Sequence, residues 1–263
     1  MSDRVTVSME GGVADVRLTR PDKLNACDVA MFEALAETAD GLAKEPGLRA
    51  VVLSGEGRGF SAGIDVSAFG SGAGGRNLFE RGDASPANFV QHSAWAWREL
   101  PAPVVAGVHG VCFGAGLQIA LAADVRFVAP DARLSVMEIK WGLVPDVSGT
   151  RTLIHLVRDD VARELVYTGR EVSGTEAVAL GLASHVSDDP HEAALELARE
   201  IATKSPSAIR ADKKLLNAAR LLDDAAGLLL EEGLQRSVMG KPNQLEAVQA
   251  NLEKRPPNFR NPD

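Results

Sequence analysis

The chain has 263 residues, of which 45% are hydrophobic and 24% are charged, and its formal net charge is −8. These values are ordinary for a folded globular protein, and the length suits one principal domain or a domain with a small appendage. The negative charge, without a dominant cluster of Lys and Arg, excludes a general nucleic-acid surface. An anionic ligand can still be accommodated by a local basic pocket.

The cysteine content and the start of the chain indicate where the protein works. Cys27 and Cys112 show neither metal-ligand nor redox spacing, and the opening MSDRVTVSMEGG has no hydrophobic signal core and no Arg/Ser-rich presequence. The longest weakly polar stretch, 101–125, is interrupted by His109 and Gln118, so no membrane span is expected. We therefore expect a reduced, cytoplasmic protein with no membrane partner.

The first expected elements are two strands, at 5–9 and 13–18, whose alternating polarity around a glycine pair predicts a hairpin. A helical period then covers 28–44, and the apolar run 50–53 predicts a buried strand.

Helix and strand signals continue to alternate in the middle of the chain. We expect strands at 103–108, 125–128 and 134–137, and a helix at 115–123. Such alternation predicts parallel strands joined by right-handed crossovers, which is an α/β architecture.

The C-terminal third of the chain differs from the rest, because 205–253 is almost wholly helical in pattern. The predicted division is a core over 1–200 and a C-terminal helical region over 201–263. The segment 69–86 is rich in Gly and Ser, which predicts a mobile loop, and we interpret this loop as a lid.

Two short motifs match known patterns but lack the structural context that those patterns need. GFSAG, at 59–63, matches the serine-hydrolase pattern with Ser61 as nucleophile, but no strand runs directly into it and a poor helix follows. GSGAGG, at 70–75, matches a dinucleotide-binding pattern, but it follows no strand, and Trp95 stands where an acid is needed. The five histidines have no paired spacing, so no metal site is expected.

Two glycine turns are more informative when they are considered together. FSAGID, at 60–65, follows a predicted strand, and the segment 109–125 runs from strand through glycine turn to helix. Glycine turns let the backbone approach a ligand closely, and free N–H groups at such turns suit a developing oxyanion. The two turns could hold one carbonyl oxygen between two peptide N–H groups, although each turn alone could equally serve tight packing.

Five sequence blocks, in order along residues 3–255, resemble the crotonase or enoyl-CoA hydratase/isomerase superfamily. They are RPDKLNA (20–26), GFSAGIDV (59–66), HGVCFGAGLQIALAADVRF (109–127), PDARLSVMEIKWGLVPDVSGT (130–150) and ELVYTGREVSGTEAVALGLASHV (164–186). The resemblance implies a crotonase-type ββα spiral, with a C-terminal helical region that takes part in assembly of a homotrimer or a dimer of trimers. It also implies an acyl-CoA thioester of fatty acid metabolism as substrate, with coenzyme A as part of that substrate and no separate cofactor.

Carried over by position, the resemblance implies an oxyanion hole formed by the backbone N–H groups of Ile64 and Ala115. Family members usually have glycine at the second position, but alanine is compatible because the backbone makes the contact. The residues expected to contact substrate or coenzyme A are Lys23, Leu24, Ala26, Ala62, Gly63, Asp65 and Gly116.

Three positions decide which reaction the resemblance implies. Hydratases of the family set two glutamates around a water, and the corresponding residues here are Gln118 and Glu138. An amide does not accept a proton at neutral pH. Asp146, in PDVSGT, resembles instead the dienoyl-CoA isomerases, whose acid–base pair is a glutamate and an aspartate eight residues apart, although those enzymes have a third acid at the position of Gln118.

The expected catalytic residues are therefore Glu138, Asp146 and Gln118, with double-bond isomerisation favoured. The alternatives are hydration led by Glu138 and a catalytically silent coenzyme A-binding protein. In structural roles, Asp146 would form an Asx turn or cap a helix beginning near Ser148, and Glu138 would pair with Lys140 or an arginine. The apolar stretch that contains both acids is otherwise expected to be buried.

Overall fold

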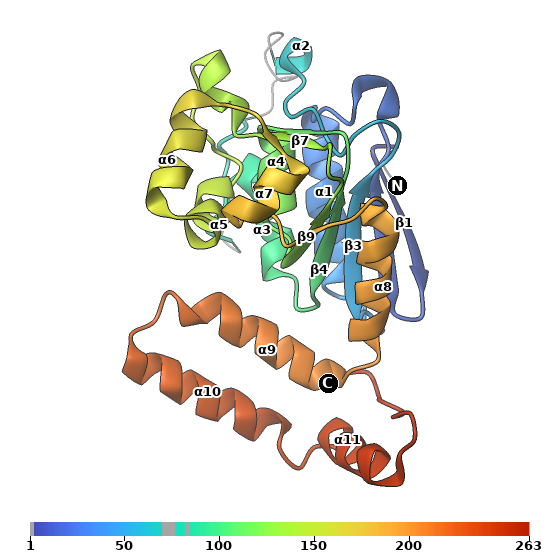
Figure 1. The fold of residues 1–263 in the computed structure, drawn as a ribbon. Helices are drawn as coiled ribbons and strands as arrows, with labels where there is room; N and C mark the ends of the chain where they lie inside the picture. Colours follow the sequence, from blue (N-terminus) through green and yellow to red (C-terminus); the bar gives the residue numbers. More distant parts are fainter. Residues whose placement is uncertain (1–2, 70–76, 83–84, 263) are drawn as a thin grey trace.

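The computed structural model describes residues 3–69, 77–82 and 85–262. Residues 70–76 and 83–84, which belong to the loop expected to be mobile and to act as a lid, lie outside the described residues. The described chain forms an α/β body with a helical arm below it in the view of Figure 1.

A six-stranded sheet forms the centre of the body, in the order β1-β2-β3-β4-β6-β9. The hairpin expected at the start is confirmed, since β1 and β2 pair antiparallel, and every later neighbouring pair is parallel as predicted. All six residues of β3 are buried, as expected for a parallel strand that is covered on both faces. The strands are β1 (Val5–Glu10), β2 (Val13–Leu18), β3 (Ala50–Gly55), β4 (Val104–Val108), β6 (Val125–Val128) and β9 (His185–Val186).

A second sheet contains β5 (Val111–Phe113), β7 (Arg133–Ser135) and β8 (Val172–Ser173). The strand expected at 134–137 is wrong at its end, because Met137 begins the 3₁₀ helix η3 (Met137–Trp141). The cause is the partner strand: Phe113, the last residue of β5, pairs with Ser135, and the chain then turns away at Gly114 with a φ of 49°.

Helices cover both faces of the six-stranded sheet (Figure 1). On one face lie α1 (Val29–Leu42), α3 (Phe89–Glu99) and α4 (Ala115–Leu121), and α8 (Pro190–Ala202) packs on the other. The start of α1 is fixed by Asp28, whose side chain accepts a hydrogen bond of 2.8 Å from the backbone N–H of Met31. The remaining elements of the body are η1 (Pro21–Lys23), α2 (Val66–Phe69), α5 (Gly149–Leu156), α6 (Asp159–Thr168) and α7 (Gly174–Leu180).

The helical arm contains α9 (Pro206–Ala219), α10 (Asp224–Val238) and α11 (Pro242–Glu253). The break between body and arm lies at 203–205, because α8 still packs on the sheet. One buried side chain connects the two parts: the ammonium of Lys213 lies 2.9 Å from the Asp124 carboxylate and donates to the carbonyls of Trp97 and Ala102. None of the helices described is both long enough and apolar enough to cross a membrane.

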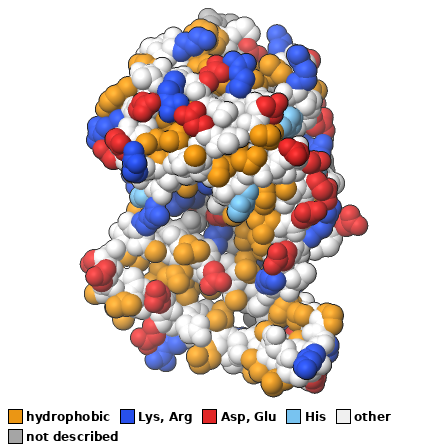
Figure 2. All heavy atoms as spheres, viewed as in Figure 1, with side chains coloured by type: hydrophobic (Ala, Val, Ile, Leu, Met, Phe, Trp, Pro, Cys, Tyr) orange, Lys and Arg blue, Asp and Glu red, His pale blue; other side chains and the backbone are white. Residues whose placement is uncertain are grey.

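Large hydrophobic side chains remain at the surface of the arm, in the lower half of Figure 2. Leu216, Leu228, Leu229 and Leu252 are 73%, 64%, 69% and 80% exposed. Such a concentration of apolar surface is typical of a face that contacts another protein surface.

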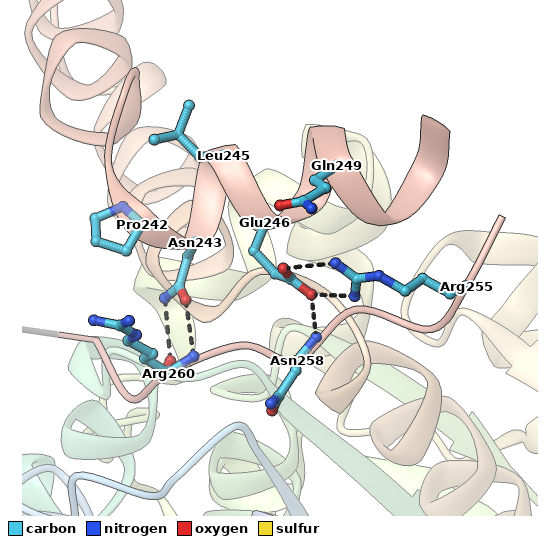
Figure 3. A pocket seen from close by; sticks show the side chains of 8 residues that line it. All are labelled: Pro242, Asn243, Leu245, Glu246, Gln249, Arg255, Asn258 and Arg260. Atoms are coloured by element: carbon cyan, nitrogen blue, oxygen red, sulfur yellow. Dashed lines mark hydrogen bonds and ion pairs between the residues drawn. The ribbon is translucent and has the colours of Figure 1, made fainter. Parts of the chain in front are cut away.

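A hollow at the end of the arm is lined by α11 and the tail that follows it (Figure 3). The Glu246 carboxylate accepts hydrogen bonds from the Arg255 guanidinium at 2.7 Å and from the backbone N–H of Asn258 at 2.6 Å. The Asn243 side chain makes two hydrogen bonds to the backbone of Arg260. These polar groups pair with one another, and their hydrogen bonds attach the C-terminal tail to α11. The lining residues of the hollow therefore show no proton-transfer pair.

Candidate active site

The two glycine turns singled out in the sequence lie against each other. Gly63 has a φ of 90°, a conformation that strongly favours glycine. A Cβ atom at this position would stand 2.7 Å from the carbonyl oxygen of Phe113 and 3.6 Å from the backbone nitrogen of Ala115. The fold therefore brings the turn at 61–65 and the start of α4 together, as the oxyanion-hole hypothesis requires.

The two chain neighbours of Ile64 both hydrogen-bond to the backbone of Cys27. Cys27 donates its N–H to the carbonyl of Gly63 at 2.7 Å, and Asp65 donates its N–H to the carbonyl of Cys27 at 2.9 Å. The N–H groups of Ile64 and Ala115 themselves have no acceptor among the residues that the structure describes. Two rigidly placed, unused donors from adjoining turns are suited to a carbonyl oxygen that gains negative charge.

The loop expected to contact coenzyme A has an unusual backbone, since Leu24 and Asn25 have φ values of 50° and 54°. The Asn25 side chain is fully buried and supports this conformation: its amide donates to the carbonyl of Gly59 at 2.9 Å and its oxygen accepts from the backbone N–H of Arg20 at 2.8 Å. Ala62 donates its N–H to the carbonyl of Leu24 at 2.8 Å. The loop is thereby held against the turn at 61–65, which is called the oxyanion turn below.

Lys23 and Ala26, also expected at the coenzyme A site, differ in exposure. Lys23 ends η1 with an exposed side chain, so its ammonium is free to approach an anionic ligand, whereas Ala26 is only 8% exposed.

Gly116 has a packing role that the sequence alone did not distinguish from ligand contact. A Cβ atom there would lie 2.6 Å from the Cβ of Ser61 and 2.7 Å from its carbonyl oxygen, so only glycine lets α4 approach the oxyanion turn so closely. The Ser61 hydroxyl donates to the carbonyl of Asn25 at 2.8 Å, which identifies it as a support of the turn.

Gln118 lies on α4 and is 2% exposed. Its amide oxygen accepts hydrogen bonds from the backbone N–H groups of Val147 at 2.8 Å and Gly149 at 3.0 Å. Because backbone N–H groups can only donate, the amide nitrogen must face the other way, where it donates to Oε1 of Glu138 at 2.6 Å. The side chain therefore has a fixed orientation and a single role toward Glu138, that of a donor.

Glu138 lies on η3 and is 5% exposed. Oε1 is bonded by Gln118, whereas Oε2 has no hydrogen-bond partner among the described residues. Burial raises the pKa of Glu138, and the nearby charge of Asp146 raises it further. No ion pair with Lys140 or an arginine is present in the described part of the chain, so the structural role considered for Glu138 is replaced by its bond to Gln118.

Asp146 lies in the segment that precedes α5 and is partly buried, and this burial raises its pKa. The helix-capping role does not apply, since the N-cap residue of α5 is Ser148 and the N–H of Gly149, the first residue of the helix, donates to the Gln118 amide oxygen. The structure thus bonds Gln118 to Glu138 and brings Asp146 near enough for its charge to act on Glu138, while the catalytic roles of the three residues stay predictions.

The apolar stretch around these acids was expected to be buried, and this expectation is wrong. Ile139, Trp141, Leu143 and Val144 are 46%, 57%, 53% and 73% exposed. The reason is local: η3 ends at Gly142 in a left-handed conformation, and the chain then loops outward before α5. These four side chains, which lie between Glu138 and Asp146 in the sequence, are called the apolar rim below.

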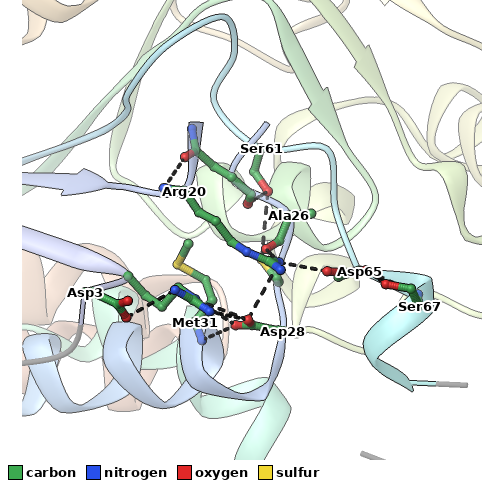
Figure 4. Close-up of polar contacts among 11 residues, drawn as sticks. Asp3, Arg20, Ala26, Asp28, Met31, Ser61, Asp65 and Ser67 are labelled. Atoms are coloured by element: carbon green, nitrogen blue, oxygen red, sulfur yellow. Dashed lines mark hydrogen bonds and ion pairs between the residues drawn. The ribbon is translucent and has the colours of Figure 1, made fainter. Parts of the chain in front are cut away.

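The Asp65 side chain lies between Arg20 and Ser67, as Figure 4 shows. Its carboxylate lies 2.8 Å from the Arg20 guanidinium and accepts a bond of 2.6 Å from the Ser67 hydroxyl. These contacts, first that from Ser67 and then that from Arg20, lower the pKa of Asp65. Sequence reasoning missed Arg20: it begins the RPDKLNA block, but nothing in the local pattern names its partner.

Other reactive groups in the described chain lack the setting that catalysis requires. The thiols of Cys27 and Cys112 are both fully buried, and burial raises the pKa of Cys27 to about 12, so no thiolate nucleophile forms near neutral pH. Within the described residues, no three or more His, Cys, Asp and Glu side chains gather as metal ligands.

The comparisons with known proteins agree with this geometry. A family model described as Enoyl-CoA hydratase/isomerase matches residues 8–262. The "Probable enoyl-CoA hydratase" of Bacillus subtilis (strain 168) is 32% identical over 262 residues, covering 97% of this chain and 98% of that protein. The human "Delta(3,5)-Delta(2,4)-dienoyl-CoA isomerase, mitochondrial" is 32% identical over 268 residues, covering 95% of this chain and 79% of that protein.

Solved structures give the same result for the fold. A crystal structure of an enoyl-CoA hydratase from Bacillus anthracis has a TM-score of 0.88 at 28% identity and covers 98% of this chain and 100% of that chain. A structure from Streptomyces coelicolor A3(2) has a TM-score of 0.91 at 33% identity, covering 100% and 96%. The predicted α/β crotonase fold with C-terminal helices is confirmed. The chain belongs to the enoyl-CoA hydratase/isomerase, or crotonase, family of enzymes that act on acyl-CoA.

Proposed function

We propose that the protein moves a double bond in enoyl- or dienoyl-CoA thioesters, with Glu138 and Asp146 as the acid–base pair. The observation that supports this most is the fixed orientation of Gln118, whose amide oxygen is occupied by two backbone N–H groups. Gln118 can donate to Glu138 but cannot take up a proton, so it does not replace the second glutamate of a hydratase. Asp146 is the neighbouring carboxylate whose charge Glu138 senses.

The proposed reaction has two proton transfers and adds no water. One carboxylate removes a proton from the carbon next to the thioester carbonyl, and the electron pair moves onto the carbonyl oxygen to give an enolate. The N–H groups of Ile64 and Ala115 stabilise this oxyanion, and one such donor is typically worth about 10²- to 10³-fold in rate. The other carboxylic acid then returns a proton to a carbon further along the acyl chain.

The raised pKa values of both acids suit this exchange. Burial makes each carboxyl group hold its proton more tightly, and the charge of Asp146 adds to this effect at Glu138, which favours a pair with one protonated and one ionised member. Each well-placed acid or base contributes about 10²- to 10⁴-fold in rate when its pKa lies near the working pH.

Substrate binding is assigned by position in the family motifs. Coenzyme A would contact the loop with Lys23, Leu24 and Ala26, and the thioester would lie against the turn 62–65. The apolar rim formed by Ile139, Trp141, Leu143 and Val144 would face the acyl chain or a second subunit.

Hydration of 2-enoyl-CoA led by Glu138 is the second candidate. It is favoured by the free Oε2 atom of Glu138, which could accept a proton from a water, and by the hydratase names of relatives. A protein that binds coenzyme A without reaction is the third possibility.

Product analysis separates these functions. The purified protein is incubated with 2-enoyl-, 3-enoyl- and 3,5-dienoyl-CoA, and the products are followed by ultraviolet absorption and mass spectrometry. Isomerisation predicts a change of conjugation at constant mass. Efficient gain of one water on 2-enoyl-CoA, without isomerisation of the other two, would contradict the proposal in favour of hydration. Coenzyme A binding with no turnover of any thioester would contradict it in favour of the silent protein.

A further inference from the structure

We propose that Arg20 is a positioning residue for the oxyanion hole, because it connects the coenzyme A loop to the turn that presents the N–H of Ile64. The inference rests on the proposed function. Neither the sequence around Arg20 nor its separation from Asp65 along the chain indicates this role.

The guanidinium of Arg20 lies among three groups from two segments of the chain, 26–28 and the turn that contains Asp65 (Figure 4). Its Nη1 atom lies 2.8 Å from the carboxylate of Asp65, 3.0 Å from the carbonyl oxygen of Ala26 and 3.7 Å from the carboxylate of Asp28. The side chains of Arg20, Asp65 and Asp28 are 15%, 11% and 14% exposed. The cluster is therefore largely shielded from water, where such contacts are stronger than at the surface.

Asp65 connects this cluster to the oxyanion turn, because it directly follows Ile64. The backbone of the turn is held on one side by the paired hydrogen bonds between Cys27 and residues 63 and 65. The Asp65 side chain supplies the second attachment, through Arg20 and Ser67. With both attachments present, the Ile64 N–H has one direction, and a donor displaced by about 1 Å can cost on the order of 10²-fold in rate.

The two acids of the cluster differ in how much they depend on Arg20. Asp28 has a second arginine, Arg4, at 2.9 Å and also caps α1. Asp65 has no other cationic partner among the described residues. Loss of Arg20 would therefore leave helix α1 capped and Asp28 paired, while the carboxylate next to the oxyanion donor would lose its only cation.

The geometry also favours arginine over lysine at this position. Arg20 donates at once to a carboxylate and a carbonyl, for which a planar guanidinium is preorganised, whereas an ammonium on a flexible stem is not. We expect Arg20→Lys to keep part of the effect and Arg20→Met to lose it.

The test uses two ligands that share coenzyme A but differ at the carbonyl. A conjugated arylacryloyl-CoA thioester absorbs at longer wavelength when its thioester carbonyl is polarised, and an S-alkyl-CoA thioether has no thioester carbonyl. We expect wild type to shift the thioester spectrum and Arg20→Met and Asp65→Asn to lose most of this shift. The kcat of both variants should fall by about 10- to 10²-fold, with thioether affinity retained.

Arg4→Met is the matched control, since it removes the other arginine bound to Asp28 and leaves Asp65 untouched; it should keep the spectral shift. Asp65→Asn preserves the contacts of Arg20 with Ala26 and Asp28, so it remains informative if Arg20→Met does not fold. A full spectral shift in folded Arg20→Met or Asp65→Asn, or a parallel loss of thioether binding, would overturn the inference alone. A wild type that binds the thioester without a shift would instead contradict the oxyanion hole of the proposed function.

Discussion

At the residue scale, the fixed amide of Gln118 determines which carboxylate oxygen of Glu138 is hydrogen-bonded. Its oxygen is occupied by Val147 and Gly149, and its nitrogen donates to Glu138 Oε1 at 2.6 Å. Oε2 of Glu138 therefore has no hydrogen-bond partner among the described residues, and in the proposed reaction it is the atom that exchanges the proton. A single substitution at position 118 should therefore change the reaction as well as its rate.

We predict that Gln118→Glu gains hydration of 2-enoyl-CoA, because a second carboxyl group then stands beside Glu138 and can exchange protons with a water. A gain of about 10²-fold over wild type is the size expected of one added acid–base group. Steady-state assays with 2-enoyl-CoA measure it, and Gln118→Leu, which adds no acid, is the control. Hydration that stays at the wild-type level in a folded Gln118→Glu protein would contradict this role.

Glu138 should also make the stability of the fold depend on pH. Its native pKa is raised above the ordinary value of 4.5, so the folded protein binds this proton more tightly than the unfolded chain does. The stabilisation is complete below about pH 4.5 and is lost as the pH rises through the native pKa.

We therefore predict that Glu138→Gln becomes more stable relative to wild type as the pH is raised from about 4.5 toward neutrality. Urea unfolding at a series of pH values gives the difference in the free energy of unfolding. Glu231→Gln, a substitution at an exposed position of α10, is the control and should show no such trend. A difference for Glu138→Gln that does not change with pH would contradict the assigned burial.

At the scale of elements, the two glycine turns hold the site together. Gly63→Ala would place a methyl group 2.7 Å from the Phe113 carbonyl at a φ of 90°. We predict a loss of about 1–3 kcal/mol in stability and a fall of about 10²-fold in kcat, because the Ile64 N–H would move. Thermal unfolding and turnover measure the two effects. Gly227→Ala, in α10 with open space around it, should alter neither activity nor fold.

The elements that sequence predicts well are those with a local cause. The hairpin of β1 and β2 follows from alternation and a glycine pair, and α1 follows from its apolar period and the Asp28 cap. The predicted end of the strand at 134–137 was wrong because the end of β7 depends on where β5 stops, which is set by the tertiary structure.

The candidate site shows the same division. Glu138 and Asp146 are eight residues apart within one family motif, so the sequence alone identifies them as candidates. The direction of the Gln118 amide depends on backbone N–H groups from 147–149, and the partner of Arg20 comes from a segment 45 positions later in numbering. Neither interaction leaves a local pattern, because contacts between distant segments are set by the fold.

At the scale of the whole molecule, the exposed leucines of the arm indicate a surface for association, and the family resemblance implies that the partners are further copies of the chain in a trimer or a dimer of trimers. We expect wild type to sediment as such an oligomer and the double variant Leu228→Gln/Leu229→Gln to shift toward the monomer, since apolar surface at these positions is replaced by polar groups. Analytical ultracentrifugation measures this, with Glu231→Gln as a control on the same helix. A monomeric wild type, or a double variant that assembles normally, would contradict it.

The proton-transfer pair is tested most directly by Asp146→Asn, with turnover of 3-enoyl- and 3,5-dienoyl-CoA followed in deuterated water. We predict that this variant keeps coenzyme A binding but loses isomerisation and deuterium uptake by about 10²- to 10⁴-fold, because an amide cannot exchange the proton. Asp131→Asn, at an exposed turn, should behave as wild type. Isomerisation by Asp146→Asn at the wild-type rate would contradict the assignment of Glu138 and Asp146 as the working pair.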